Sequence, residues 1–214
     1  MPSLVLVLRT VVAIVVFHAV SVAQDKIIHE RTSRLNHILV TEDDRGLRTL
    51  RFERGGPRQS VVKLGDPDHL ELPYARAMPS GLAFVQQPRR VLIVGLGGGT
   101  IPGFLHKHYP DLRIDVVEID PDVVDVARSF FGFQDDKRMR AYVDDGRRFI
   151  QACREPYDII FLDAFDRDSI PYHLATREFL QAVRRALRPN GLVVANIWSR
   201  YSNSLYDSML RTYQ

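Results

Sequence analysis

The chain has 214 residues, enough for one domain with appended segments and for a sizeable buried core. Its hydrophobic fraction of 45% and charged fraction of 26% are those of an ordinary globular protein. The net charge of +3 comes from basic residues scattered among acids, which is typical of a mixed-charge surface and disfavours a nucleic-acid partner. The single cysteine, Cys153, excludes an intramolecular disulfide and a cysteine-rich metal site, and we expect it to be a packing residue on a helix.

Residues 1–23 differ from the rest of the chain because they are almost wholly apolar. Small residues at Ser21 and Ala23 have the spacing that a signal peptidase accepts, after the apolar core of roughly 7–15 residues that such a peptide needs. The run is at the short end of the ~20 residues that span a bilayer. We therefore predict that residues 1–23 are a signal peptide or a membrane anchor and meet the membrane, and that the protein is exported, periplasmic or membrane-anchored. If this signal is not real, the protein is cytoplasmic.

Residues 24–85 are predicted to be a small N-terminal β region and a linking helix. Apolar residues that nearly alternate predict strands at 34–40 and 47–52, with an Asp-Asp-Arg-Gly turn between them. A Gly-Gly-Pro turn precedes a third run at 59–64. We therefore expect two or three antiparallel strands, followed by a helix at 74–84.

Residues 86–214 change to alternating strand and helix patterns, which predict an α/β fold with a Rossmann-like, doubly wound and mostly parallel sheet. An amphipathic helix is predicted at 204–213. Because such sheets normally continue with another strand or two, we expect the chain to be incomplete at its C-terminus. The expected strands are 91–95, 114–118, 139–143, 157–163 and 191–197, and the expected helices are 100–108, 121–130, 146–153 and 175–187.

A glycine-rich turn follows the first strand of this domain. In Gly95-Leu96-Gly97-Gly98-Gly99 the missing Cβ atoms let the backbone turn sharply and approach a ligand closely. Glu118 ends the next strand, where an acid is placed to accept hydrogen bonds from ribose hydroxyls. The turn lacks the Gly-Lys-Ser/Thr ending of a phosphate-binding loop, which disfavours ATP hydrolysis. The pattern therefore predicts an adenosine-like ligand.

Acids also follow the third and fourth strands of this domain. Asp145, before Gly146, is placed to accept a hydrogen bond from the exocyclic amine of adenine, or alternatively to cap the following helix. Asp163 and Asp166 follow the fourth strand and could bind an amine substrate and accept its proton, or be surface acids of a loop. Ligands bind at the carboxyl ends of strands in open parallel sheets, where all these acids are expected to lie.

These motifs together resemble the spermidine synthase (polyamine aminopropyltransferase) family, within the class I adenosylmethionine-dependent methyltransferase fold. The resemblance covers roughly residues 59–199. It rests on the glycine-rich turn, on Val117-Glu118-Ile119-Asp120, on Asp145-Gly146 and on Tyr157-Asp158-x-Ile-x-x-Asp163-x-x-Asp166. The resemblance implies transfer of an aminopropyl group from decarboxylated S-adenosylmethionine to a diamine such as putrescine, without a metal, in an enzyme that is often a homodimer.

The resemblance also implies a role for each matching residue. Asp163 would be the base that deprotonates the attacking amine, while Asp166 and Tyr74 would bind the amine substrate. Glu118 would hold the ribose and Asp145 the adenine amine. The other residues expected to bind the cofactor are Gln59, Gly95, Gly97, Gly99 and Gly146.

Several positions depart from the family pattern, among them Gly98 and Arg76. Gly98 stands where the family carries an aspartate that contacts the aminopropyl amine, and Arg76 replaces a glutamate and would repel a polyamine. Gly98 leaves room for the carboxylate of ordinary S-adenosylmethionine. The alternatives are therefore a methyltransferase that uses S-adenosylmethionine, or a non-catalytic exported homologue that binds an adenosyl ligand.

Overall fold

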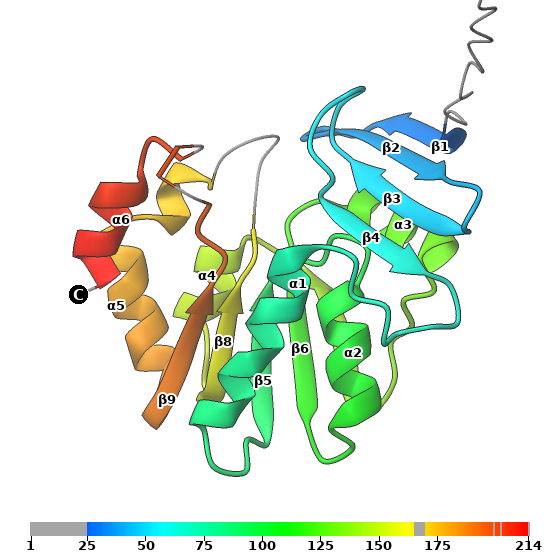
Figure 1. Ribbon diagram of the computed structural model, residues 1–214. Helices are drawn as coiled ribbons and strands as arrows, with labels where there is room; N and C mark the ends of the chain where they lie inside the picture. The colour runs from blue at the N-terminus through cyan, green and yellow to red at the C-terminus, as the bar shows by residue number, and fades with distance from the viewer. Residues whose placement is uncertain (1–24, 165–169, 199, 202, 214) are drawn as a thin grey trace, which may run out of the picture.

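The computed structural model describes residues 25–164, 170–198, 200–201 and 203–213, which form two sheets flanked by helices (Figure 1). The first sheet is antiparallel and has the order β1-β2-β3-β4. Its strands are β1 (Lys26–Thr32), β2 (His37–Glu42), β3 (Leu47–Arg51) and β4 (Ser60–Lys63). The expected two or three strands are therefore four. The sequence analysis missed β1 because this edge strand is mostly exposed and has no alternating apolar pattern.

The first sheet packs on helix α3 (Pro121–Phe130) through an apolar cluster of its own. Polar contacts fix its position as well, because Ser33 Oγ and Asn36 Nδ2 donate to Asp120 Oδ2 at 2.5 and 3.0 Å. Asp120 is buried and also caps α3. The cluster contains Ile38, Val40, Leu50, Phe52, Val123, Val126 and Phe131. The small sheet is thereby held beside the carboxyl ends of the strands of the second sheet.

The second sheet is parallel and has the order β7-β6-β5-β8-β9. The chain builds outward from β5 to β7 on one side and then returns to β8 and β9 on the other, which is the doubly wound arrangement that the sequence predicted. Its strands are β5 (Arg90–Val94), β6 (Arg113–Glu118), β7 (Met139–Val143), β8 (Tyr157–Leu162) and β9 (Leu187–Ala195). The α/β fold class is therefore confirmed.

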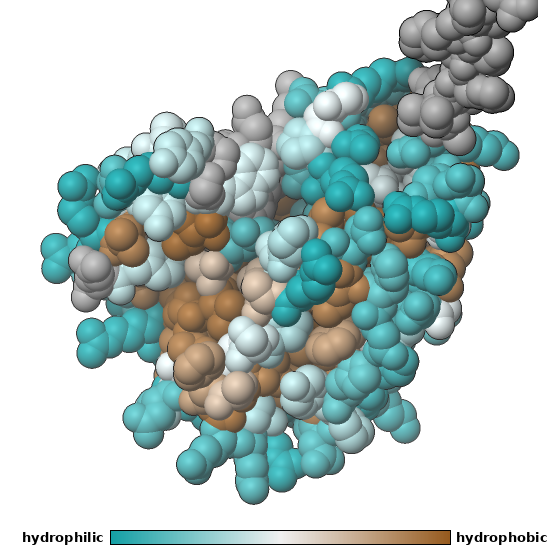
Figure 2. All heavy atoms as spheres, in the orientation of Figure 1, coloured by the Kyte–Doolittle hydropathy of each residue, from teal (hydrophilic) through white to brown (hydrophobic). Residues whose placement is uncertain are grey.

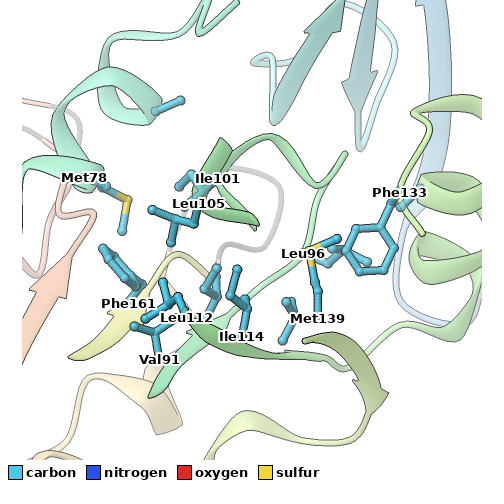
Figure 3. Packing of buried hydrophobic residues seen from close by; sticks show 14 of the residues in the cluster. Met78, Val91, Leu96, Ile101, Leu105, Leu112, Ile114, Phe133, Met139 and Phe161 are labelled. Atoms are coloured by element: carbon cyan, nitrogen blue, oxygen red, sulfur yellow. The ribbon is translucent and has the colours of Figure 1, made fainter. Parts of the chain in front are cut away.

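Helices cover both faces of this sheet because β5 points alternate apolar side chains to opposite sides. Val91 and Ile93 belong to a cluster with Ile101 and Leu105 of α2, part of which Figure 3 shows. Leu92 and Val94 instead join the cluster beneath α4 and α5. These and the last helix are α2 (Thr100–His108), α4 (Gly146–Gln151), α5 (Arg177–Ala186) and α6 (Tyr206–Tyr213).

Some predicted boundaries were wrong for local reasons. The expected helix at 74–84 is a short α1 (Pro73–Ala77) followed by the 3-10 helix η1 (Met78–Phe84), where Pro79 supplies no N–H to a continued α-helix. The last strand, β9, begins at Leu187 and not at residue 191. Cys153 packs at the edge of a core cluster, as expected, but lies beyond the end of α4.

The surface has an apolar area over β9 and η1 (Figure 2). Gly81 of η1 makes this close packing possible, because a Cβ there would lie 2.4 Å from Val194 Cγ2. Within the described ranges, no helix is long and apolar enough to cross a membrane. Residues 1–23, predicted to be a signal peptide or anchor, lie outside the described residues.

Candidate active site

A cavity of about 380 Å³ lies at the carboxyl ends of β5, β6 and β8. This is the switch point of the sheet, where the chain reverses the direction in which it adds strands and where open parallel sheets bind ligands. Residues of the first sheet and its loops, among them Asn36 and Phe52, line the same cavity. The two sheets therefore build one site together.

The glycine turn forms the floor of this cavity, and each glycine has its own reason. Gly95 has a φ of 99°, and a Cβ there would lie 2.3 Å from the backbone oxygen of Asp163. Gly97 has a φ of 54° and lines the cavity with Gly95. Gly99 has a φ of 77° and caps α2 against Phe133, outside the cavity lining. The positive φ of Gly99 is needed for the turn into α2, and the structure does not place Gly99 in contact with the cavity.

Glu118 lies at the end of β6 with its carboxylate fixed in the cavity wall. Its two oxygens accept hydrogen bonds from the backbone N–H groups of Leu96 at 2.9 Å and Asp120 at 3.1 Å. Burial raises the pKa of this carboxyl, and the backbone hydrogen bonds oppose that rise. The side chain is therefore orientated before any ligand arrives, with acceptor capacity left for hydroxyl donors.

Asp145 is a helix cap, one of the two roles that the sequence left open, and its place in the cavity wall leaves the adenine contact a prediction. Its Oδ1 accepts from the Arg148 N–H at 2.8 Å and thereby caps α4, while the residue also lines the cavity. Its Oδ2 lies 2.9 Å from His173 Nε2. The neighbouring Gly146 is required by packing, since a Cβ there would lie 2.6 Å from Val94 Cγ1.

Asp163 follows β8 and lies opposite the glycine turn. Its backbone N–H donates to the Val94 carbonyl at 2.8 Å, and its Oδ1 accepts from Asn196 Nδ2 at 2.9 Å. Burial raises the pKa of Asp163 to about 7; the Asn196 hydrogen bond lowers it and the nearby Glu118 charge raises it. A carboxyl with a pKa near neutrality can both take and return a proton.

Tyr74 lies on α1 and closes the cavity on the side of Asp163. Its hydroxyl donates to the Gln59 carbonyl at 2.8 Å, so both residues stand in the wall together. Burial and the negative charge of Asp163 raise the pKa of Tyr74 well above its ordinary value. Arg76, in contrast, is exposed and does not line the cavity, so the expectation that its charge repels an amine ligand was wrong.

Gly98 occupies a position that packing has closed. A Cβ at Gly98 would lie 2.8 Å from Phe131 Cδ1 and 2.9 Å from Ser60 Oγ. Ser60 is itself held by Thr100, whose Oγ1 lies 2.9 Å from Ser60 Oγ. An aspartate at this position would therefore displace the first sheet or the end of α3. The packing of the structure thus agrees with the loss of the family's aspartate at this position.

The cavity gathers eight of the ten predicted site residues, while their roles remain predictions. Asp166 lies outside the described residues, and Gly99 faces away. Sequence reasoning missed His173 and Tyr172, which come from the short 3-10 helix η2 (Tyr172–Leu174) and carry no motif of their own. The eight are Gln59, Tyr74, Gly95, Gly97, Glu118, Asp145, Gly146 and Asp163.

No group of three or more His, Cys, Asp or Glu side chains among the described residues is arranged to hold a metal ion. The carboxylates of Glu118, Asp145 and Asp163 line the cavity at the ends of β6, β7 and β8, and carboxylates accept hydrogen bonds from hydroxyls and amines such as those of an adenosyl ligand. The fold and the site together define the class I adenosylmethionine-dependent methyltransferase fold.

The spermine/spermidine synthase domain family matches residues 74–204. The chain belongs to this family. It is 39% identical over 200 residues to a polyamine aminopropyltransferase of Vibrio vulnificus, covering 91% of this chain and 66% of the relative. The chain thus spans slightly less than two thirds of that protein.

Methyltransferases are also similar to the chain. It is 35% identical over 173 residues to the human eEF1A lysine and N-terminal methyltransferase, covering 72% of this chain and 24% of that protein. The crystal structure of human methyltransferase-like protein 13 in complex with SAH superposes with a TM-score of 0.60 at 34% identity. This match covers 66% of the present chain and 71% of the solved one.

Proposed function

We propose that this protein is a transferase that moves an aminopropyl group from decarboxylated S-adenosylmethionine to a diamine such as putrescine. The observation that carries the proposal is the buried Asp163, whose pKa of about 7 suits a base at neutral pH. Membership of the spermine/spermidine synthase domain family supports aminopropyl transfer in general. The diamine itself is inferred from the family resemblance.

The reaction needs a neutral amine nitrogen, because a protonated amine has no lone pair with which to attack. The adenosyl sulfonium supplies an activated carbon, and attack forms a C–N bond while the C–S bond breaks and its electron pair stays on sulfur. Asp163 accepts the proton that the amine must lose. The Asn196 hydrogen bond holds this carboxylate in one orientation. Because Gly95 has no Cβ, the glycine turn packs directly against the backbone of Asp163, and a ligand on the turn lies close to the carboxylate.

The remaining side chains hold the two ligands. Glu118 is orientated to accept from the ribose hydroxyls and Asp145 from the adenine amine. Tyr74 remains neutral and presents an apolar ring beside Asp163, where burial keeps bulk water from the carboxylate. Asp166 is proposed to bind the distal cation of the diamine on the strength of the family resemblance.

A second candidate is methyl transfer from S-adenosylmethionine to an amine. Gly98 favours it, because the closed packing around this residue leaves no place for the acid that would bind the aminopropyl amine of the decarboxylated donor. The likeness to a lysine and N-terminal methyltransferase supports the same candidate. Both reactions use the same base and the same adenosine contacts.

The two candidates are separated by donor preference and by product. Purified protein is titrated calorimetrically with S-adenosylmethionine and with its decarboxylated form, and then incubated with each donor and putrescine. Tighter binding of the decarboxylated form and formation of spermidine with 5′-methylthioadenosine support the first candidate. Preference for S-adenosylmethionine, with S-adenosylhomocysteine as product, would replace it by the second. Binding without either product would leave a non-catalytic adenosyl-binding homologue.

Location and assembly are part of the proposal. We infer that residues 1–23 direct export to the periplasm or anchor the protein at the membrane, from their apolar composition and the Ser21 and Ala23 spacing. Fractionation of cells that produce the full chain tests this, with N-terminal sequencing of the product. A homodimer is expected from the family, and sedimentation of the purified protein measures it.

A further inference from the structure

We propose that His173 is a positioning residue, which orientates Asp145 so that the cavity selects an adenine amine over other purine substituents. The inference rests on the proposed function, because it takes the cavity as an adenosyl site. His173 comes from η2, far along the chain from Asp145, and the sequence motifs of the site do not include it. The two side chains nevertheless meet in the cavity wall.

The imidazole of His173 is fixed by its surroundings. Its Nε2 lies 2.9 Å from Asp145 Oδ2, and its backbone carbonyl accepts from Arg147 Nη1 at 3.2 Å. The next residue, Leu174, is buried in the apolar cluster beneath α4 and α5. These two contacts hold the backbone of η2 on α4 and the core, from where the partly exposed imidazole reaches Asp145.

Two donors then fix the two oxygens of Asp145. The Arg148 N–H binds Oδ1 at 2.8 Å, and His173 binds Oδ2 at 2.9 Å. An ionised carboxylate has about four acceptor positions, so two remain for a ligand. A carboxylate held at both oxygens cannot rotate about its last bond, and a preorganised acceptor loses less entropy when a ligand binds.

This geometry predicts a selectivity that a loosely held acid would not give. The exocyclic amine of adenine donates a hydrogen bond to a fixed oxygen of Asp145. Hypoxanthine has a carbonyl oxygen at that place, so two hydrogen-bond acceptors would face each other and neither would have a donor. His173 contributes only if it keeps the acceptor in place. Its removal should therefore weaken discrimination between the two bases more than it weakens binding in general.

Side-chain length provides a strict comparison. Glutamine carries its amide nitrogen at about the reach of His Nε2, whereas asparagine corresponds to the nearer Nδ1. His173→Gln should therefore keep the hydrogen bond to Asp145, and His173→Asn should lose it together with His173→Ala. His106→Ala is a matched control, because His106 Nε2 lies 2.9 Å from Asp136 Oδ2 outside the cavity.

The experiment titrates the full chain and each variant calorimetrically with 5′-methylthioadenosine and with 5′-methylthioinosine. The readout is the ratio of the two dissociation constants. We expect the wild type to prefer the adenine compound. In the Ala and Asn variants the ratio should be about tenfold smaller, which corresponds to the free energy of one charge-assisted hydrogen bond. His173→Gln and His106→Ala should keep the ratio near the wild-type value.

Any of four results would contradict the inference. A His173→Ala variant that binds both compounds more weakly by the same factor would show a structural role only. Equal ratios of dissociation constants in the Gln and Asn variants would show that Nε2 does not position Asp145. This comparison tests the inference even if the Ala variant does not fold. A wild type that binds both compounds equally would overturn the selectivity and leave the transfer proposal standing, whereas binding of neither would overturn both.

Discussion

The two sides of the cavity differ in how closely they follow the family pattern. The adenosine side, formed by Glu118, Asp145 and His173, has acids held by backbone N–H groups and by a neighbouring imidazole. The proposed transfer side, formed by Asp163 and Tyr74, keeps the acid proposed as the base, while packing around the neighbouring Gly98, which does not line the cavity, leaves no room for the second acid of the family pattern. On the proposed function, the contrast teaches that separate residues of one site hold the adenosine and choose the transferred group.

The separation has a structural origin. The adenosine-side acids follow β6 and β7, whereas Asp163 and Asn196 follow β8 and β9 on the other side of β5. Gly98 lies in the glycine turn after β5, where Ser60 of the first sheet and Phe131 pack against it. A change in the packing of the small sheet can therefore alter the transfer side and leave the adenosine side intact.

The largest expected effect comes from Asp163→Asn, which tests the transfer side alone. Loss of a general base should lower the rate of amine transfer by about 10²–10⁴-fold. The dissociation constant for 5′-methylthioadenosine should change little, since the base is not proposed to hold adenosine. Asp144→Asn is the control, because Asp144 follows β7, pairs with Arg148 and does not line the cavity. Equal turnover of wild type and Asp163→Asn would remove Asp163 from this role.

Glu118→Gln breaks the adenosine side instead. Two backbone N–H groups donate to this carboxylate, so an amide must present its own N–H group to one of these donors. We expect 5′-methylthioadenosine to bind about 10- to 100-fold more weakly, the range for hydrogen bonds to a charged group. Calorimetric titration measures this, with thermal melting as the check on folding. An unchanged dissociation constant would place the ribose elsewhere.

Gly98→Ala tests how closely the glycine turn is packed, by comparison with a glycine that has free space around it. A methyl group at Gly98 meets Phe131 and Ser60, and overpacking of this kind costs about 1–3 kcal/mol of unfolding free energy. Gly103→Ala is the matched variant, since a Cβ there meets no atom within 4 Å and lies on α2. That variant should gain up to about 1 kcal/mol. Urea unfolding of both proteins measures the difference, and equal stabilities would show that Gly98 is not closely packed.

Much of the fold and the site could be predicted because each element has a local signature. The alternating burial of β5 residues follows its apolar run, and Gly95 is required where the turn approaches the Asp163 backbone. The acids at the strand ends meet because parallel strands end at one edge. Asp145 lies between the end of β7 and the start of α4, so it both caps the helix and lines the cavity.

The remaining features depend on contacts between distant segments, which no local pattern encodes. His173 reaches Asp145 only through the packing of η2 on α4. Arg76 lies two positions after Tyr74 on α1 and is exposed outside the cavity lining, which its identity alone did not reveal. The closure around Gly98 depends on Phe131, which a different helix end supplies.

The pH dependence of amine transfer is the most direct test of the central claim that Asp163 is the base. The ionised carboxylate is the active form, and burial raises its pKa to about 7, so the rate should fall as the pH is lowered through about 7. Asn196→Ala removes a hydrogen bond that lowers this pKa, so the fall should move to higher pH. A rate that stays level across neutral pH, or a fall that Asn196→Ala leaves in place, would contradict the account.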